Sequence, residues 1–237
     1  VIFSRIHGGL ISYRYGGEQL LRSIPRPNFW RAMTENDRAN LLPFRAGQWD
    51  VASRYVSAKF ADGMRLSNYE VEELPDRVKV SYLLHLPTMP ELACSLVYTV
   101  FGDGEIKTEL ILPPSAAVGE LPELSVLFSM DASFDRLTWY GLGPEETYAD
   151  RNHAKLGVYS NRVADNAARY VIPQETGNKE GVRWAKVMND RGHGMIFRCG
   201  GLVRAFADKA ALEKLLNEKL TTMQLIMDKN IILSLVR

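Results

Sequence analysis

Apolar and polar residues alternate along much of this chain, which is the pattern of a β-strand with one buried face. In residues 78–86, for example, Val78, Val80 and Tyr82 alternate with Lys79 and Ser81. Runs of the same kind recur at residues 92–101, 105–112, 124–130, 182–188 and 195–198. Strong turn signals separate them, among them Gly8-Gly9, Gly16-Gly17, Asp62-Gly63, Gly102-Asp103-Gly104 and Asn189-Asp190-Arg191-Gly192. This spacing predicts antiparallel hairpins.

Only two segments have a helical pattern. Residues 208–220 carry leucines on one face and charged residues on the other, with Asp208 as a suitable N-cap. A shorter helix is predicted at residues 48–55. Repeated strands with few helices favour an all-β fold, because each sheet must bury one face against another. We expect a large antiparallel β-sandwich with one or two short helices, folded as a single domain over residues 1–237.

Composition excludes several classes of function. Lysine and arginine total 29 against 28 aspartates and glutamates, so no net charge steers the chain toward nucleic acid or an anionic membrane. No apolar run approaches the roughly 20 residues that span a bilayer, and the first residues do not resemble a signal peptide. Because the chain begins without methionine, we expect a fragment of a longer protein.

Cys94 and Cys199 are the two cysteines, and they lack the paired spacing of a structural zinc site or a disulfide framework. A single bridge between them stays open. Cys94 lies within the apolar run at residues 92–101 and Cys199 ends another run, so we expect two buried small hydrophobic residues rather than nucleophiles. A reducing compartment fits this usage best, and we expect a cytoplasmic protein.

The densest group of candidate chemistry lies at residues 138–151, which read Thr-Trp-Tyr-Gly-Leu-Gly-Pro-Glu-Glu-Thr-Tyr-Ala-Asp-Arg. Gly141, Gly143 and Pro144 are expected to break any regular element there. The candidate site residues of this window are Trp139, Glu145, Tyr148, Asp150 and Arg151. Aromatic and charged groups together suit a sugar-facing surface, and a loop corner held by its own salt bridge is the plainer alternative.

Two further segments give this window a context. Residues 27–38 read Pro-Asn-Phe-Trp-Arg-Ala-Met-Thr-Glu-Asn-Asp-Arg, and residues 170–178 read Tyr-Val-Ile-Pro-Gln-Glu-Thr-Gly-Asn. Together the three segments resemble the C-terminal (fifth, small-chain) domain of family-2 glycoside hydrolases of the β-galactosidase type. That family usually has Phe-Trp-Arg-Ala-Pro-Thr-Asp-Asn-Asp, Gly-Leu-Gly-Pro-x-Glu-x-Tyr-x-Asp-Arg and Pro-x-Glu-x-Gly-Asn. This chain departs from it at Met33 and Glu35, where proline and aspartate are usual.

The resemblance implies a galactose-mutarotase-like β-supersandwich, in agreement with the strand pattern. It also implies that the catalytic carboxylates lie elsewhere, in a central barrel domain. A retaining glycosidase needs two carboxyl groups about 5 Å apart, and no motif here matches either catalytic segment. The family's Gly-Gly-Asp-Asp-Ser-Trp loop, which brings a tryptophan to the sugar site, is also absent from the sequence. The resemblance therefore implies a part of a retaining β-galactosidase that is catalytically silent alone.

The first segment supplies a second group of candidates, namely Trp30, Arg31, Glu35, Asp37 and Arg38. These residues suit stacking on a pyranose ring and bonding to its hydroxyls, or alternatively a buried tryptophan beside an ion pair that fixes the loop. Glu175 is the last candidate, because true mutarotases of this fold use a glutamate base. No histidine of the chain matches a mutarotase motif.

The leading interpretation is therefore a domain that walls the active-site cleft of a β-galactosidase and packs on its catalytic barrel. The expected partners are that barrel, the other domains of the enzyme and a galactoside. Without the barrel, the apolar docking surface of this chain is exposed, so we expect the isolated chain to self-associate. No His/Asp/Glu spacing indicates a metal site, and the resemblance implies that the parent enzyme holds magnesium outside this chain. The alternatives are a stand-alone carbohydrate-binding module and a mutarotase-like enzyme.

Overall fold

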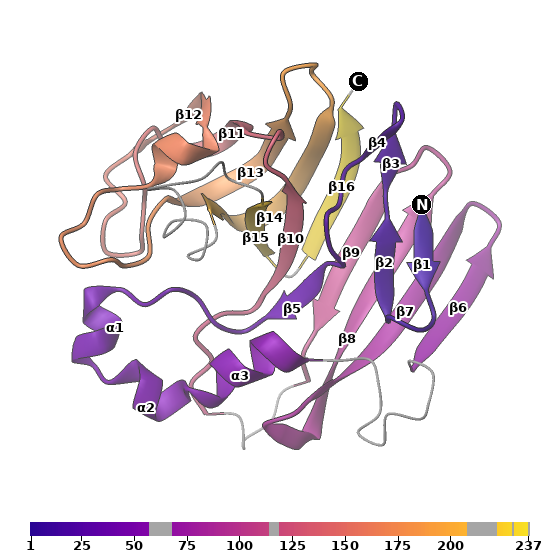
Figure 1. The fold of residues 1–237 in the computed structure, drawn as a ribbon, viewed down its shortest axis with the longest axis horizontal. Helices are drawn as coiled ribbons and strands as arrows, with labels where there is room; N and C mark the ends of the chain where they lie inside the picture. The colour runs from indigo at the N-terminus through magenta and orange to yellow at the C-terminus, as the bar shows by residue number, and fades with distance from the viewer. Residues whose placement is uncertain (57–67, 114–118, 208–221, 229, 237) are drawn as a thin grey trace.

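The computed structural model describes residues 1–56, 68–113, 119–207, 222–228 and 230–236 (Figure 1). The chain is built mainly from antiparallel strands, so the all-β prediction is confirmed. Across these residues, no helix has the length and apolar character that a bilayer crossing requires. The helix predicted at residues 208–220 lies outside the described part of the chain.

Twelve strands form one sheet in which neighbouring strands are antiparallel. Along its main path the order is β12-β11-β13-β14-β16-β9-β8-β7-β6. The bounds are β5 (Arg26–Asn28), β6 (Tyr69–Leu74), β7 (Arg77–Leu86), β8 (Met89–Phe101), β9 (Ile106–Ile111), β10 (Ser125–Asp131), β11 (Arg136–Gly143), β12 (Lys155–Arg162), β13 (Asn178–Met188), β14 (Gly194–Ala207), β15 (Thr222–Asp228) and β16 (Asn230–Val236).

β14 joins the main path to a branch, because residues 194–199 pair with β16 and residues 203–207 pair with β15. β15 then pairs with β10, and β10 with β5. The rings of Phe128 on β10 and Phe197 on β14 meet with their centroids 5.5 Å apart, so the branch packs against the main path. A large shared core results, as the predicted sandwich requires.

Two hairpins at the N-terminus cover the β7–β9 part of the sheet. They are β1 (Ile2–Ser4) with β2 (Gly9–Ser12), and β3 (Arg14–Tyr15) with β4 (Glu18–Gln19). Phe3 stacks on Tyr98 of β8 at 5.3 Å, and the Tyr13 hydroxyl donates to the Gly104 carbonyl at 2.8 Å. This cover explains why alternate residues of β7, such as Val80 and Tyr82, are buried.

Cys94 of β8 has no exposed surface, and burial raises the pKa of its thiol to about 12. The expectation that Cys94 is a buried small residue is therefore confirmed, and a raised thiol pKa disfavours the reactive thiolate. Cys199 lies on β14.

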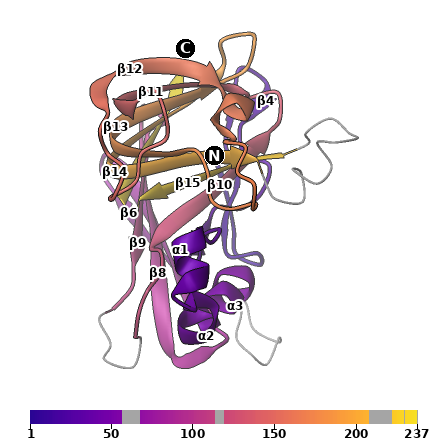
Figure 2. The same cartoon turned by 90° about the vertical axis from the view of Figure 1, so that its left-hand side faces the viewer.

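Three short helices follow β5, rather than the one predicted in this region. α3 (Gln48–Tyr55) has the predicted bounds, and it packs through Trp49 against Phe29 at 5.3 Å. α1 (Glu35–Ala39) and α2 (Leu42–Ala46) were not predicted, because each is too short to show a hydrophobic period. All three lie along one side of the sheet (Figure 2).

The expectation that Gly141 and Gly143 break regular structure is wrong, since β11 continues to Gly143. Both glycines face inward, where there is no room for a larger side chain. A Cβ at Gly143 would lie 2.7 Å from the Tyr159 ring, and one at Gly141 would lie 2.9 Å from Val182 Cγ2. Here glycine serves close packing within a strand and does not mark a turn.

Candidate functional site

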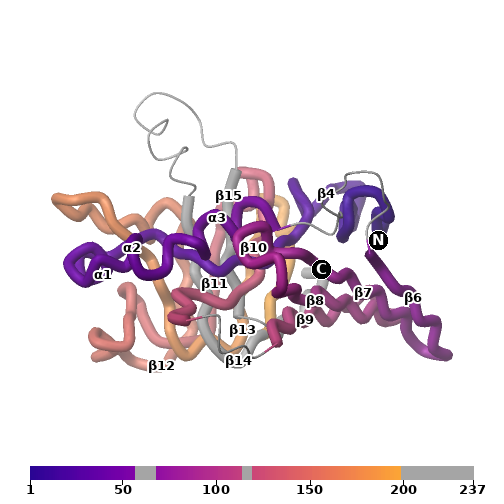
Figure 3. Tube along the Cα trace, turned by 90° about the horizontal axis from the view of Figure 1, so that it is seen from below, coloured from indigo at the N-terminus to yellow at the C-terminus, as the bar shows by residue number. Residues whose placement is uncertain are grey.

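Three segments that are far apart in the sequence meet at one end of the molecule. The first and third are joined directly, because Arg38 Nη2 donates to the Pro173 carbonyl at 2.5 Å and the Glu175 N–H donates to the Met33 carbonyl at 3.2 Å. α1 and α2 stand at this end, and β6 stands at the other (Figure 3). The name loop end is used below for residues 30–38, 144–151 and 173–178.

The second segment joins the third through a different set of bonds. The Thr147 N–H donates to the Asn178 carbonyl at 2.8 Å, and Asn178 Nδ2 donates to the Thr147 carbonyl at 2.6 Å. The Gly177 N–H donates to Glu146 Oε2 at 2.8 Å. The third segment therefore bridges the other two.

Arg31 links two carboxylates at the loop end. Its guanidinium donates to both oxygens of Asp37, at 2.5 and 2.9 Å, and to Glu175 Oε2 at 3.0 Å. The three side chains are largely removed from solvent, with exposed fractions of 22% for Arg31, 15% for Asp37 and 6% for Glu175. A bidentate ion pair of this kind fixes the relative orientation of the two side chains and also neutralises their charges.

The Asp37 carboxylate also begins helix α1. It accepts from the Thr34 N–H at 2.8 Å, while Thr34 Oγ1 accepts from the Asp37 N–H at 3.2 Å, which is a reciprocal capping box. Burial alone would raise the pKa of Asp37, but the bonds from Arg31 and Thr34 outweigh burial and hold that pKa below its ordinary value. Asp37 is therefore an ionised acceptor, and it lacks the raised pKa that a general acid of a glycosidase needs.

Glu146 plays the matching part in the second segment. It accepts from the Tyr170 hydroxyl, from Arg151 Nη2 and from the Gly177 N–H. Burial would raise the pKa of Glu146, yet these three donors lower it overall. Our sequence reasoning selected its neighbour Glu145 instead, although the glutamate of the Gly-Leu-Gly-Pro-x-Glu pattern falls on Glu146.

Comparison with known proteins shows the family to which the chain belongs. A family model described as "Beta galactosidase small chain" matches residues 1–230. This chain belongs to that family. The chain is 42% identical over 198 residues to a β-galactosidase of Priestia megaterium. It is 36% identical over 199 residues to a β-galactosidase of Halalkalibacterium halodurans.

The coverage of these relatives is uneven. The match covers 83% of this chain but 18% of the Priestia megaterium protein, and 82% of this chain but 19% of the Halalkalibacterium halodurans protein. The Latilactobacillus sakei "Beta-galactosidase small subunit" is 27% identical, and the match covers 78% of this chain and 62% of that protein. This small chain thus spans about a fifth of the length of the longer relatives.

The structure places both candidate tryptophans of the small chain inward. Trp139 is 1% exposed, and its Nε1 donates to the Leu142 carbonyl at 3.0 Å. Trp30 is half-buried and packs against the core. Trp139 therefore cannot stack on a sugar that approaches from solvent. Glu35, Glu145 and Asp150 are the exposed carboxylates among the candidates.

The remaining candidates, Tyr148 and Arg151, belong to the scaffold of the loop. Their backbones exchange two hydrogen bonds, of 3.1 and 2.8 Å, and the Arg151 guanidinium lies 5.6 Å from the centre of the Tyr148 ring. Lys179, which the sequence reasoning missed, is 3% exposed beside them. Its Nζ donates to the Pro144 carbonyl at 3.1 Å and sits 4.9 Å from the Trp139 ring centre. Burial lowers the pKa of Lys179, and Glu146 and Glu145 oppose that effect.

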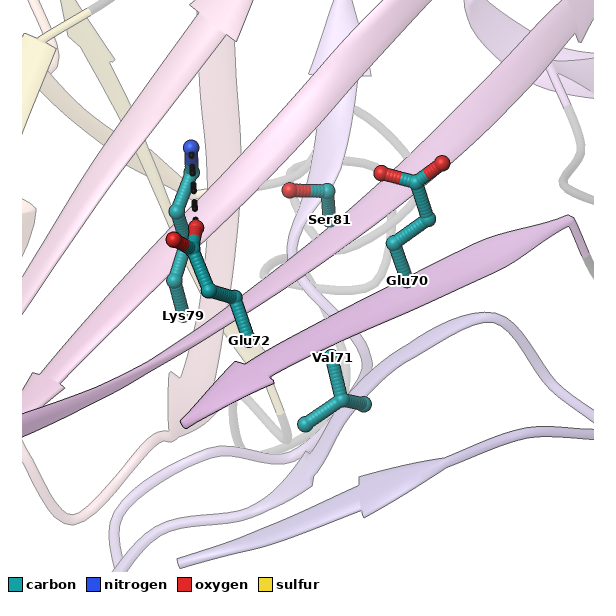
Figure 4. Close-up of a pocket in the computed structure, with 5 residues that line it drawn as sticks. All are labelled: Glu70, Val71, Glu72, Lys79 and Ser81. Carbon is teal, nitrogen blue, oxygen red and sulfur yellow. Dashed lines mark ion pairs between the residues drawn. The ribbon is translucent and has the colours of Figure 1, made fainter. Parts of the chain in front are cut away.

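The described surface includes the following two hollows. The larger, of about 760 Å³, adjoins the loop end and is lined by polar groups that include Glu145, Glu146 and Arg169. The smaller, of about 380 Å³, lies on β6 and β7 at the far end, where Glu72 and Lys79 form an ion pair of 3.8 Å (Figure 4). Within the described residues, no group of three or more His, Cys, Asp or Glu side chains is arranged to hold a metal ion.

Proposed function

We propose that this small chain is the C-terminal domain of a family-2, retaining β-galactosidase, and that its loop end forms part of the wall of the substrate cleft. The observation that carries the proposal is the gathering of three separate motif segments into one bonded cluster. The motif residues form hydrogen bonds with one another. Arg31, for example, donates to both Asp37 and Glu175. Such a cluster holds the backbone of a wall rigidly while exposed side chains face the substrate.

In this proposal the reaction itself belongs to the rest of the enzyme. Hydrolysis with retention requires one carboxylic acid to protonate the leaving oxygen and one carboxylate to attack the anomeric carbon. Asp37 and Glu175 are both bound to Arg31, and Asp37 has a lowered pKa, so they fit a scaffold better than an acid and a nucleophile. The relatives leave room for a catalytic barrel, because this chain spans 18% of the Priestia megaterium β-galactosidase.

The partners follow from the same proposal. They are the catalytic barrel, the other domains and a β-galactoside, together with further copies of the enzyme where it assembles into an oligomer. The residues described here do not fit magnesium, since they offer no cluster of three or more oxygen- or nitrogen-donating acidic and histidine side chains. We derive no step through a metal in this chain and propose that the enzyme holds it elsewhere.

Glu35 provides the sharpest test of the cleft wall. It is the exposed carboxylate of the first segment, and its backbone N–H is fixed by Gln174 Oε1 at 2.9 Å. In the intact β-galactosidase that contains this chain, Glu35→Ala should raise KM for a chromogenic β-galactoside about fivefold, the loss of one hydrogen bond of ~1 kcal/mol. Glu91→Ala, at an exposed position of β8, should leave KM unchanged. Equal KM values for both variants would refute the cleft-wall role.

The larger hollow favours a second candidate, which is sugar binding by the chain on its own. Its volume of about 760 Å³ lies in the usual range for a small-molecule site, and its lining includes charged side chains such as Glu145 and Arg169. Calorimetric titration of the isolated chain with galactose and lactose decides between the two. Millimolar binding that Glu145→Ala abolishes supports a binding module, whereas no heat at tens of millimolar sugar supports the cleft wall.

A mutarotase-like activity is the weakest of the three. A catalytic base must reach the proton of the sugar hydroxyl, but Glu175 is 7% exposed and its carboxylate accepts from Arg31. Polarimetry of fresh α-galactose with the chain tests this activity. A faster rotation change that Glu175→Gln removes would support it.

A further inference from the structure

Four apolar side chains stand in solvent beside the loop end. The exposed fractions are 57% for Leu41, 86% for Phe44, 101% for Val171 and 50% for Ile172. Leu41 and Phe44 belong to the α1–α2 corner, and Val171 and Ile172 directly precede Pro173 of the third segment. These four residues are called the apolar rim below. Exposed apolar groups in such a concentration are typical of an interaction surface.

The apolar rim is held in place from both sides. Leu41 has a φ of 55°, a left-handed conformation that costs energy for a leucine, and its carbonyl accepts from the Phe44 N–H at 3.0 Å. The bond from Arg38 to the Pro173 carbonyl ties the corner to the segment that carries Val171. The exposed side chains are therefore presented by a fixed backbone, which reduces the entropy lost on binding.

Two exposed valines elsewhere in the described chain, Val71 and Val158, have a different setting. Val71 on the end strand β6 is 51% exposed, but it lies between Glu70 and Glu72. Charged neighbours on an edge strand oppose association with another protein. Val158, 63% exposed on β12, is flanked by Gly157 and Tyr159 and lies on a strand that begins with a lysine and ends with an arginine. Val158 serves as a control below.

We propose that the apolar rim is the surface on which this chain docks against the remainder of its β-galactosidase. The inference rests on the proposed function and names the contact surface for it. The relative lengths of the proteins indicate what covers the rim. This chain matches 18% of the Priestia megaterium β-galactosidase, and the rest of such an enzyme must cover part of the chain. The rim is also continuous with the loop end, so docking there places the proposed cleft wall at the junction.

Hydroxyl-radical footprinting with mass spectrometry tests the proposal. The isolated chain and the intact β-galactosidase that contains it are oxidised under the same conditions. Phe44 and Leu41 should be oxidised at least tenfold more slowly in the intact enzyme, whereas Leu156, a leucine of β12 with 47% exposure, should keep its rate. Unchanged rates at Phe44 and Leu41 would overturn the proposal. Protection of Phe44 and Leu41 in the intact enzyme that is lost on dilution would assign the rim to a contact between copies of the enzyme, which also overturns the proposal.

A pair of variants adds an independent readout. Val171→Asp and Val158→Asp each place a carboxylate at an exposed valine, so neither should move the unfolding midpoint of the isolated chain. In the intact enzyme, Val171→Asp should shorten the half-life of thermal inactivation at least fivefold, and Val158→Asp should change it less than twofold. Equal half-lives would count against the rim. A different result is that Glu35→Ala raises KM while Phe44 and Leu41 in the intact enzyme are oxidised as fast as in the isolated chain. That result would support the cleft-wall role and refute only the docking surface.

Discussion

Replacing Arg31 with methionine removes a guanidinium that binds both Asp37 and Glu175. The exposed fractions of these two carboxylates are 15% and 6%, so Glu175 would be left as a buried charge without this partner. Breaking a buried ion pair by removing one member costs about 3–5 kcal/mol, and the 22% exposure of Arg31 places the expected loss near ~3 kcal/mol. For a domain of this size, that loss lowers the unfolding midpoint by about 6–12 °C.

Thermal unfolding of the isolated chain, followed by circular dichroism, measures this shift. Arg54→Met is the matched control, because Arg54 pairs with Asp50 at 2.9 Å on the surface, with exposed fractions of 65% and 33%. An exposed pair of this kind contributes about 0.3–0.5 kcal/mol, so the control should lose about 2 °C or less.

The reasoning is refuted if Arg31→Met and Arg54→Met lower the midpoint equally. A double variant sharpens the test, since Arg31→Met with Glu175→Gln removes the stranded charge as well as its partner. It should recover part of the loss of Arg31→Met. A double variant less stable than Arg31→Met would show that the charge of Glu175 is not what the arginine neutralises.

Two further predictions concern the same scaffold. The pKa values of Asp37 and Glu146 are lowered in the folded chain, so their stabilisation is complete above the unfolded values near about 4 and is lost as pH falls through the folded values. Acid should therefore lower the unfolding midpoint below about pH 4, and Asp37→Asn should flatten that dependence; an unchanged slope in the variant would contradict the assignment. Trp139→Phe should cost about 1–3 kcal/mol, because it removes the Nε1 bond and leaves the Leu142 carbonyl without this donor. A midpoint equal to that of the unmodified chain would mean that the bond contributes nothing.

The strands were predictable wherever one face is buried and the other is solvated. β7 follows its sequence pattern closely, because alternation is the direct consequence of a half-buried strand. β11 was predicted to stop early, since glycine usually marks a turn. Its glycines are instead required by the Tyr159 ring and Val182, and no local pattern reports a contact between strands.

The candidate site was predictable as a set of motifs but not as a network. The resemblance selected Arg31, Asp37 and Glu175 without indicating that one guanidinium binds both carboxylates across 144 positions of sequence. Glu146 was missed in favour of the exposed Glu145, although the motif alone distinguishes them. Trp139 was expected to offer its ring to a sugar, but the side chain is buried. The sequence could not show this, because an aromatic residue beside charged ones is found both in cores and at sugar sites.

The central claim is that this chain contributes the wall of a β-galactosidase site and not its reacting groups. Hydrolysis of a chromogenic β-galactoside, measured for the isolated chain and for the intact enzyme at equal molar concentration, tests it most directly. The proposal predicts turnover by the intact enzyme and, for the chain alone, a rate equal to that of the buffer blank. Hydrolysis by the isolated chain above the blank, lost on Glu175→Gln or Asp37→Asn, would contradict it.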